Sequence, residues 1–177
     1  MTDFDTLDAY GALTEPTTLR IRRLLPGPIE RCWTYLTKSE LRRQWLASGE
    51  MEMTVGAPVE LVWRNDEISN PPGQRPEGFA AEHRMQSRIT ELDPPHKISF
   101  TWNDTGDVSF ELAPQGDKVL LTVIHRRLPS RAYMLRVGPG WHSHLDILVA
   151  CATGAKPAPF WDGWLRLQKE YDRLLPA

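Results

Sequence analysis

The chain has 177 residues, of which 41% are apolar and 25% are charged, and its formal net charge at pH 7 is −2. This length suits one ordinary domain, the apolar content argues against a largely disordered chain, and the small net charge argues against nucleic-acid binding. The sequence has no apolar run long enough to span a membrane and no signal-peptide pattern at its N-terminus, so we expect a cytoplasmic protein.

The N-terminal region predicts an arm, a strand and two short helices. Residues 1–15 contain four acidic residues and no lysine or arginine, and we expect them to form an acidic arm. Aliphatic and polar side chains alternate over residues 17–25, which predicts a half-buried strand. Pro28 suits the first turn of a helix, and Ser39 suits the N-cap of a second one.

The central region predicts an antiparallel meander. Its segments of alternating hydrophobicity span residues 50–54, 59–64, 81–92, 98–102, 108–112 and 118–126. Short turn signals such as Asn103-Asp104-Thr105-Gly106 separate several of these strands, which favours hairpins over parallel crossovers. Residues 65–80 are polar and contain three prolines, and we expect them to form a long loop.

The C-terminal third predicts a long amphipathic helix. A helical step of about 100° groups six side chains on one arc, namely Trp141, His144, Leu145, Leu148, Val149 and Ala152. His142 and Asp146 fall on the opposite side. We expect this helix to begin at Gly140-Trp141, after the interruption of Gly138-Pro139-Gly140, and to end at Gly154.

A final helix is predicted over residues 159–175. Its apolar stripe includes Phe160, Trp164, Leu167 and Tyr171. A stripe with three aromatic side chains indicates that the helix docks on another surface. These four residues are therefore candidate interface residues, and the docking partner is either the sheet of the same chain or a second subunit in a homodimer.

Five segments, in this order, resemble motifs of one protein superfamily. They are Pro28–Trp33, Leu41–Leu46, Glu91–Trp102, Leu121–Pro129 and Gly140–Leu145. Together they resemble the START/Bet v 1-like (SRPBCC) superfamily, and within it the subfamily named after the activator of the heat-shock protein 90 ATPase. The resemblance covers about residues 17–154.

The resemblance implies an α+β helix-grip fold. In this fold a curved antiparallel sheet, with the order strand, two short helices and meander, wraps around a long C-terminal helix. We expect this domain over residues 16–156, followed by a C-terminal helical extension over residues 157–177. The resemblance also implies a cavity between the concave face of the sheet and the long helix.

This cavity is the candidate site, and its expected ligand is an apolar or aromatic small molecule. The alternative is a core that large side chains fill completely. The candidate pocket residues from the sheet and the long helix are Trp63, His83, Met85, Trp102, Phe110, Val123, His125, Trp141, His144, Leu145 and Leu148.

The motifs of common catalytic and metal sites are absent from the sequence. Neither a zinc-ligand spacing nor a nucleophile elbow occurs, and Cys32 and Cys151 have no adjacent base. His83, His125 and His144 could form an acid/base or metal cluster, or each could be hydrogen-bonded singly. We therefore assign no catalytic residue, metal or cofactor. The expected function is a binding module, with a stress-related cochaperone-like interaction module or an uncharacterised cyclase or hydrolase as alternatives.

Overall fold

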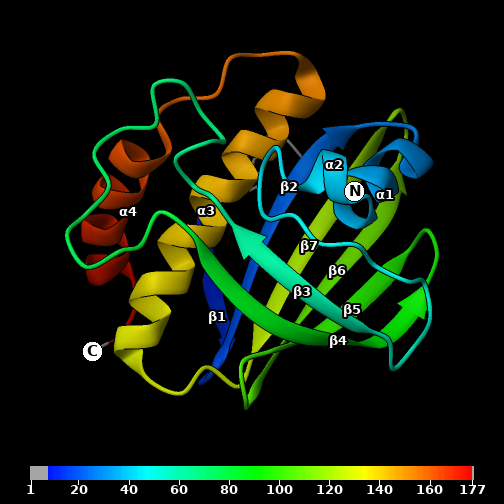
Figure 1. Ribbon diagram of the computed structural model, residues 1–177, viewed down its shortest axis with the longest axis horizontal. Coiled ribbons are helices and arrows are strands. Elements are labelled where there is room, and N and C mark those ends of the chain that lie inside the picture. The colour runs from blue at the N-terminus through cyan, green and yellow to red at the C-terminus, as the bar shows by residue number, and fades with distance from the viewer. Residues whose placement is uncertain (1–7, 177) are drawn as a thin grey trace.

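The structure is a computed structural model that describes residues 8–176, and these residues form one seven-stranded sheet and four helices (Figure 1). The strands are β1 (Ala12–Glu15), β2 (Thr18–Pro26), β3 (Pro58–Trp63), β4 (His83–Asp93), β5 (Lys97–Trp102), β6 (Gly106–Gln115) and β7 (Lys118–Arg126). The helices are α1 (Ile29–Thr37), α2 (Ser39–Arg42), α3 (Arg131–Thr153) and α4 (Phe160–Leu174).

The sheet is antiparallel throughout, with the strand order β1-β2-β7-β6-β5-β4-β3. Consecutive strands from β3 to β7 are neighbours, as the predicted meander requires. Figure 1 shows α3 lying across the curved sheet. Alternate side chains of β2 and β7, such as Ile21 and Leu121, are buried beneath it. The α+β helix-grip architecture is confirmed.

The long helix α3 begins earlier than its sequence predicts. It starts at Arg131, where the Ser130 hydroxyl accepts a hydrogen bond from the Tyr133 N–H at 3.1 Å, and it ends before Gly154, which has a φ of 78°. The expected end is confirmed, but the expected beginning at Gly140-Trp141 is wrong. Pro139 lies inside the helix, although an interior proline removes one backbone hydrogen bond.

Tertiary packing explains why α3 continues through this segment. Gly138 lies so close to α4 that a Cβ atom there would be 3.3 Å from Cδ1 of the Tyr171 ring. Gly138 and Pro139 are both buried. Close packing between the two helices therefore outweighs the weak local helix propensity of glycine and proline.

Two expectations for the first half of the chain need correction. Residues 50–54 do not form a strand, and the Met53 side chain is 38% exposed, so their alternation does not mark a buried face. Of the predicted arm, residues 1–7 lie outside the described part of the chain. Ala12–Glu15 form β1, and the backbone N–H of Gly11 donates a 2.7 Å hydrogen bond to the Tyr171 hydroxyl of α4.

Helix α4 packs along α3 within the same chain (Figure 1). The aromatic stripe that we considered a candidate interface is buried there: Phe160, Trp164, Leu167 and Tyr171 are each at most 5% exposed. Tyr171 reaches His142 of α3, and Phe160 reaches His144. The partner of the stripe is therefore another helix of this chain. Across residues 8–176, no helix is long and apolar enough to cross a membrane.

Candidate functional site

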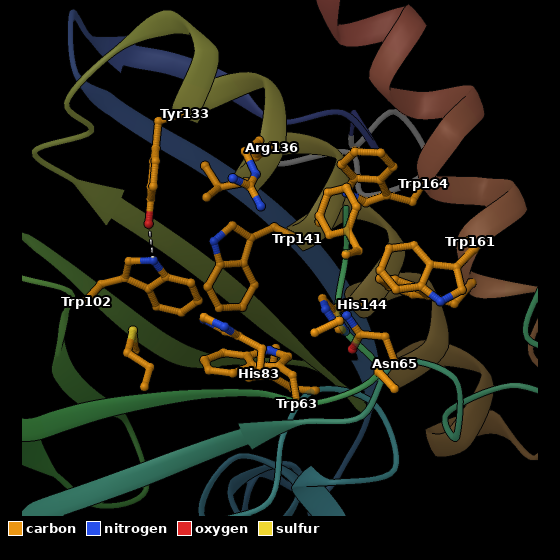
Figure 2. Close-up of a pocket in the computed structure, with 18 of the residues that line it drawn as sticks. Trp63, Asn65, His83, Trp102, Tyr133, Arg136, Trp141, His144, Trp161 and Trp164 are labelled. Atoms are coloured by element: carbon orange, nitrogen blue, oxygen red, sulfur yellow. Dashed lines mark hydrogen bonds between the residues drawn. The ribbon is translucent and has the colours of Figure 1, made fainter. Parts of the chain in front are cut away.

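A cavity of about 420 Å³ lies between the sheet, α3, α4 and the loop that joins β3 to β4. Its walls contain five of the seven tryptophans of the chain and three other aromatic residues. These aromatic residues are Trp63, Phe79, Trp102, Tyr133, Trp141, Phe160, Trp161 and Trp164. Figure 2 shows most of their side chains around one space. The large side chains thus line a space at this end of the sheet and do not fill it.

The structure divides the eleven candidate pocket residues into two groups. Six of them line the cavity, namely Trp63, His83, Met85, Trp102, Trp141 and His144. The other five lie in the core and do not line it, namely Phe110, Val123, His125, Leu145 and Leu148. Each side chain of the second group is at most 1% exposed. At the positions of these five residues, the sheet and α3 lie close enough together for side chains to fill the space between them.

The wall that the sequence did not predict comes from α4 and the β3–β4 loop. Phe79 is the one aromatic residue of this loop, and its ring lies 5.5 Å from that of Trp161 and 5.2 Å from that of Trp164. The one sequence signal for this wall was an aromatic residue in an otherwise polar loop. Trp161 belongs to the N-terminal turn of α4, outside the four-residue stripe.

Hydrogen bonds attach the β3–β4 loop to the start of α4. The indole Nε1–H of Trp161 donates to Asp66 Oδ1 at 2.7 Å, and Arg75 pairs with the same carboxylate. The backbone N–H of Phe160 donates to Ser69 Oγ at 3.0 Å. These bonds join residues about 90 positions apart in the sequence. The loop and α4 therefore form one continuous wall of the cavity.

Tyr133 provides a polar group at the sheet end of the cavity. Its hydroxyl accepts a hydrogen bond from Trp102 Nε1 at 2.8 Å (Figure 2) and a second one from Asn103 Nδ2 at 2.6 Å. The first bond fixes the Trp102 indole, whose ring also lies 5.5 Å from that of Trp141. Because the hydroxyl oxygen already accepts twice, the group that Tyr133 can offer to a ligand is its O–H proton.

His144 provides a second polar group, on the α3 wall. Its ring is 6% exposed, and Nδ1 lies 2.7 Å from the carbonyl oxygen of Trp45. The Phe160 ring lies 4.7 Å away. Burial lowers the pKa of His144 to about 4, against an ordinary value of 6.5. The imidazole is therefore neutral at pH 7.

The three histidines that could have formed a cluster have separate environments. His125 is buried in the core, where its Nδ1 accepts a hydrogen bond from Trp141 Nε1 at 3.0 Å, and burial lowers its pKa to about 3. His83 is exposed beside the Trp63 ring, at 5.6 Å. Within residues 8–176, no group of three or more histidine, cysteine or acidic side chains is placed to hold a metal ion.

Arg136 is the one arginine that lines the cavity, and no lysine or carboxylate of the described residues joins it there. Its guanidinium lies 5.1 Å from the centre of the Phe79 ring, within cation–π range. The side chain is exposed, so Arg136 lies at the solvent side of the wall. The arrangement offers aromatic surface and a few separate polar groups, as is typical of a binding pocket.

Comparisons with known proteins agree with this architecture. Residues 26–153 match the family described as activator of Hsp90 ATPase homolog 1-like protein. A Bordetella parapertussis protein solved by NMR is 32% identical, with 96% of this chain and 92% of that chain covered and a TM-score of 0.80. CalU16 from Micromonospora echinospora is 19% identical, with 90% and 89% covered and a TM-score of 0.67, and shows the fold alone. No curated protein matches the chain.

Proposed function

The chain belongs to the family of activator of Hsp90 ATPase homolog 1-like proteins, within the SRPBCC superfamily, and from that premise we propose that it binds an aromatic small molecule in the cavity between sheet, α3 and α4. The observation that supports this proposal is the aromatic wall around about 420 Å³ of space. Ligand pockets in proteins commonly measure about 300–1,000 Å³.

The geometry of the wall favours a planar aromatic ligand. Trp63 and Trp102 meet edge to face at 5.4 Å, and Phe79 and Trp164 do so at 5.2 Å. Such contacts hold the rings in fixed orientations and leave both faces and edges for a bound ring to contact. Each 100 Å² of apolar surface removed from water contributes about 2.5 kcal/mol to binding, before the costs of association.

An interaction module is supported less well by the structure. That alternative depended on a free aromatic stripe on the final helix, and Trp164, Leu167 and Tyr171 are buried against α3 in the same chain. Large apolar side chains of the described residues that remain exposed are Met53, Val55 and Leu174. Met53 and Val55 lie on one turn before β3, whereas Leu174 lies on the last turn of α4.

The first prediction concerns a variant that fills the cavity. Gly140 lines the cavity on α3, and a Cβ atom there would meet only Trp164 Nε1, at 4.0 Å. We expect Gly140→Leu to lower the affinity for the neutral fluorescent probe N-phenyl-1-naphthylamine by more than tenfold, because the added side chain occupies ligand space. The measurement is a fluorescence titration of wild type and variant.

Gly140→Ala is the matched control for this variant. Both substitutions raise helix propensity by about 1 kcal/mol over glycine, but alanine adds a single methyl group. We expect the alanine variant to bind the probe as the wild type does, and neither variant to melt at a lower temperature. Equal binding by the leucine variant would contradict the location of the site. Failure of the wild type to bind the probe or any related neutral aromatic compound would refute the function.

A further inference from the structure

His144 places a hydrogen-bond acceptor on the wall of the aromatic cavity. Its Nδ1 lies 2.7 Å from the carbonyl oxygen of Trp45. Because a carbonyl oxygen can only accept, Nδ1 carries the proton of the imidazole and donates it to this bond. A neutral imidazole has one N–H group, so Nε2 is left with a lone pair and can only accept.

The Nε2 edge of His144 opens on the cavity. Across residues 8–176, this atom has no hydrogen-bond partner in the protein, and it is not fully enclosed. It therefore keeps some accessible surface. His144 lines the cavity, and its Nδ1 edge is turned to Trp45, so this surface faces the ligand space (Figure 2).

The surroundings make this acceptor selective. Phe160 and Leu46 beside His144 offer no donor, and the Asn65 side chain, which lies next to His144 in Figure 2, donates no hydrogen bond to the ring. Burial also holds the pKa of the ring well below 7, so the ring does not gain a second N–H at neutral pH. A ligand that covers Nε2 without donating to it would leave a buried acceptor unsatisfied, and such groups are costly.

We infer that the ligand of this cavity carries a hydroxyl or N–H group that donates a hydrogen bond to Nε2 of His144. The favoured class is thus aromatic alcohols and phenols, over ethers and hydrocarbons of the same shape. This inference rests on the proposed function and makes His144 a specificity-determining residue. A hydrogen bond made in place of an unsatisfied acceptor corresponds to a preference of about tenfold.

A matched pair of ligands tests the inference. 2-Naphthol and 2-methoxynaphthalene share their ring system, but only the first can donate a hydrogen bond. Each is used to displace N-phenyl-1-naphthylamine from the wild-type protein at pH 7. We expect 2-naphthol to bind about tenfold more tightly. The ether is the more hydrophobic compound, so apolar burial alone would give the opposite order.

His144→Asn is the matched variant. Its amide N–H₂ lies close to the position of Nδ1 and can still donate to the carbonyl of Trp45, whereas it has no atom at the position of Nε2. We expect the variant to lose the preference for 2-naphthol, because its affinity for 2-naphthol falls and its affinity for the ether does not. A retained preference in the variant would overturn the assignment to His144.

Nitrogen-15 spectra of the wild-type imidazoles keep the test decisive if the variant does not fold. We expect the His144 Nε2 resonance to shift when 2-naphthol is added and to stay in place with the ether. Equal affinities of the wild type for 2-naphthol and the ether, or the absence of this Nε2 shift, would overturn the inference. Binding of the fluorescent probe would in that case still support the proposed function. Loss of all probe binding in the wild type would refute both.

Discussion

The free energy of unfolding of this protein is expected to fall by several kcal/mol between pH 6.5 and pH 4. Three histidines are buried in the folded chain, and burial lowers the pKa of His125 to about 3 and the pKa values of His142 and His144 to about 4. In the unfolded chain each imidazole returns to an ordinary pKa of 6.5. The unfolded state therefore takes up protons that the native state cannot accept.

The sign and size of the effect follow from proton linkage. Where the unfolded state binds more protons, stability rises with pH, so it is highest above pH 6.5 and falls as the pH is lowered towards 4. One pKa unit corresponds to about 1.4 kcal/mol, so each histidine contributes up to about 3 kcal/mol over this window. The main cause at all three positions is desolvation of the charged ring.

His142 shows in structural terms why protonation is resisted. The Tyr171 hydroxyl accepts a hydrogen bond from Gly11 N–H and lies 3.0 Å from His142 Nδ1. The other ring nitrogen, Nε2, faces the Asp146 carboxylate, which can only accept, so the single N–H of the neutral ring belongs at Nε2 and Nδ1 accepts the proton of the Tyr171 hydroxyl. Nδ1 must therefore be unprotonated. The opposite ring nitrogen lies 3.5 Å from Asp146 Oδ2, an attraction that offsets only part of the cost of burial. Protonation at Nδ1 would disrupt a contact that holds α4 to α3.

Urea unfolding at pH 7.5, 6.0 and 4.5 measures this prediction. His125→Asn retains an acceptor near the position of Nδ1 for Trp141 and removes the titrating ring, so we expect about one third of the pH dependence to disappear. The control is His96→Asn, in the exposed turn before β5, which should leave the pH dependence unchanged. Urea midpoints of the wild type that do not differ between pH 7.5 and pH 4.5 would contradict the prediction.

Most of the fold could be predicted from the sequence because its elements depend on local periodicity. Alternation in β2, β4 and β7 corresponds to one buried face, and the spacing from Trp141 onwards corresponds to one buried arc of α3. The opposite side of α3 is buried as well, because His142 packs there against Tyr171 of α4. The true start of α3 could not be predicted. It depends on the contact of Gly138 with Tyr171, which lie 33 positions apart in the sequence, and no local pattern encodes such a contact.

The cavity could be predicted only in part, for a similar reason. The sheet and helix residues Trp63, Trp102 and His144 share the inner face that periodicity defines. The β3–β4 loop has no periodicity, so nothing local places Phe79 beside Trp164. The stripe of α4 indicates that the helix docks on another surface, but the apolar pattern is the same whether that surface belongs to this chain or to another.

Arg42 is a residue whose structural role the sequence did not indicate. It lies in a short helix among other basic residues, yet its side chain is 0% exposed. The guanidinium donates to the carbonyl oxygen of Ala47 at 3.1 Å and to that of Leu36 at 3.2 Å, and it also binds the carbonyl of Gly49. Burial lowers its pKa to about 10, so Arg42 remains charged at pH 7.

Arg42→Met is expected to lower the free energy of unfolding by about 3–5 kcal/mol, because it leaves three carbonyl groups without their donor in a buried site. Arg42→Lys should recover only part of this loss, since an ammonium group cannot reproduce the planar set of guanidinium donors. The neighbouring exposed Arg43 supplies the control, and Arg43→Met should change stability by less than about 0.5 kcal/mol. Urea unfolding at pH 7.5 measures all three variants.

Arg42 also supports one part of the cavity wall. The segment that Arg42 holds follows Trp45 and Leu46, whose positions set the partner of His144 and one part of the cavity wall. We therefore expect Arg42→Lys, if it folds, to bind N-phenyl-1-naphthylamine more weakly than the wild type does. A loss of stability in Arg42→Met no larger than that in Arg43→Met would show that the carbonyl groups find other donors, and that the buried guanidinium does not organise this wall.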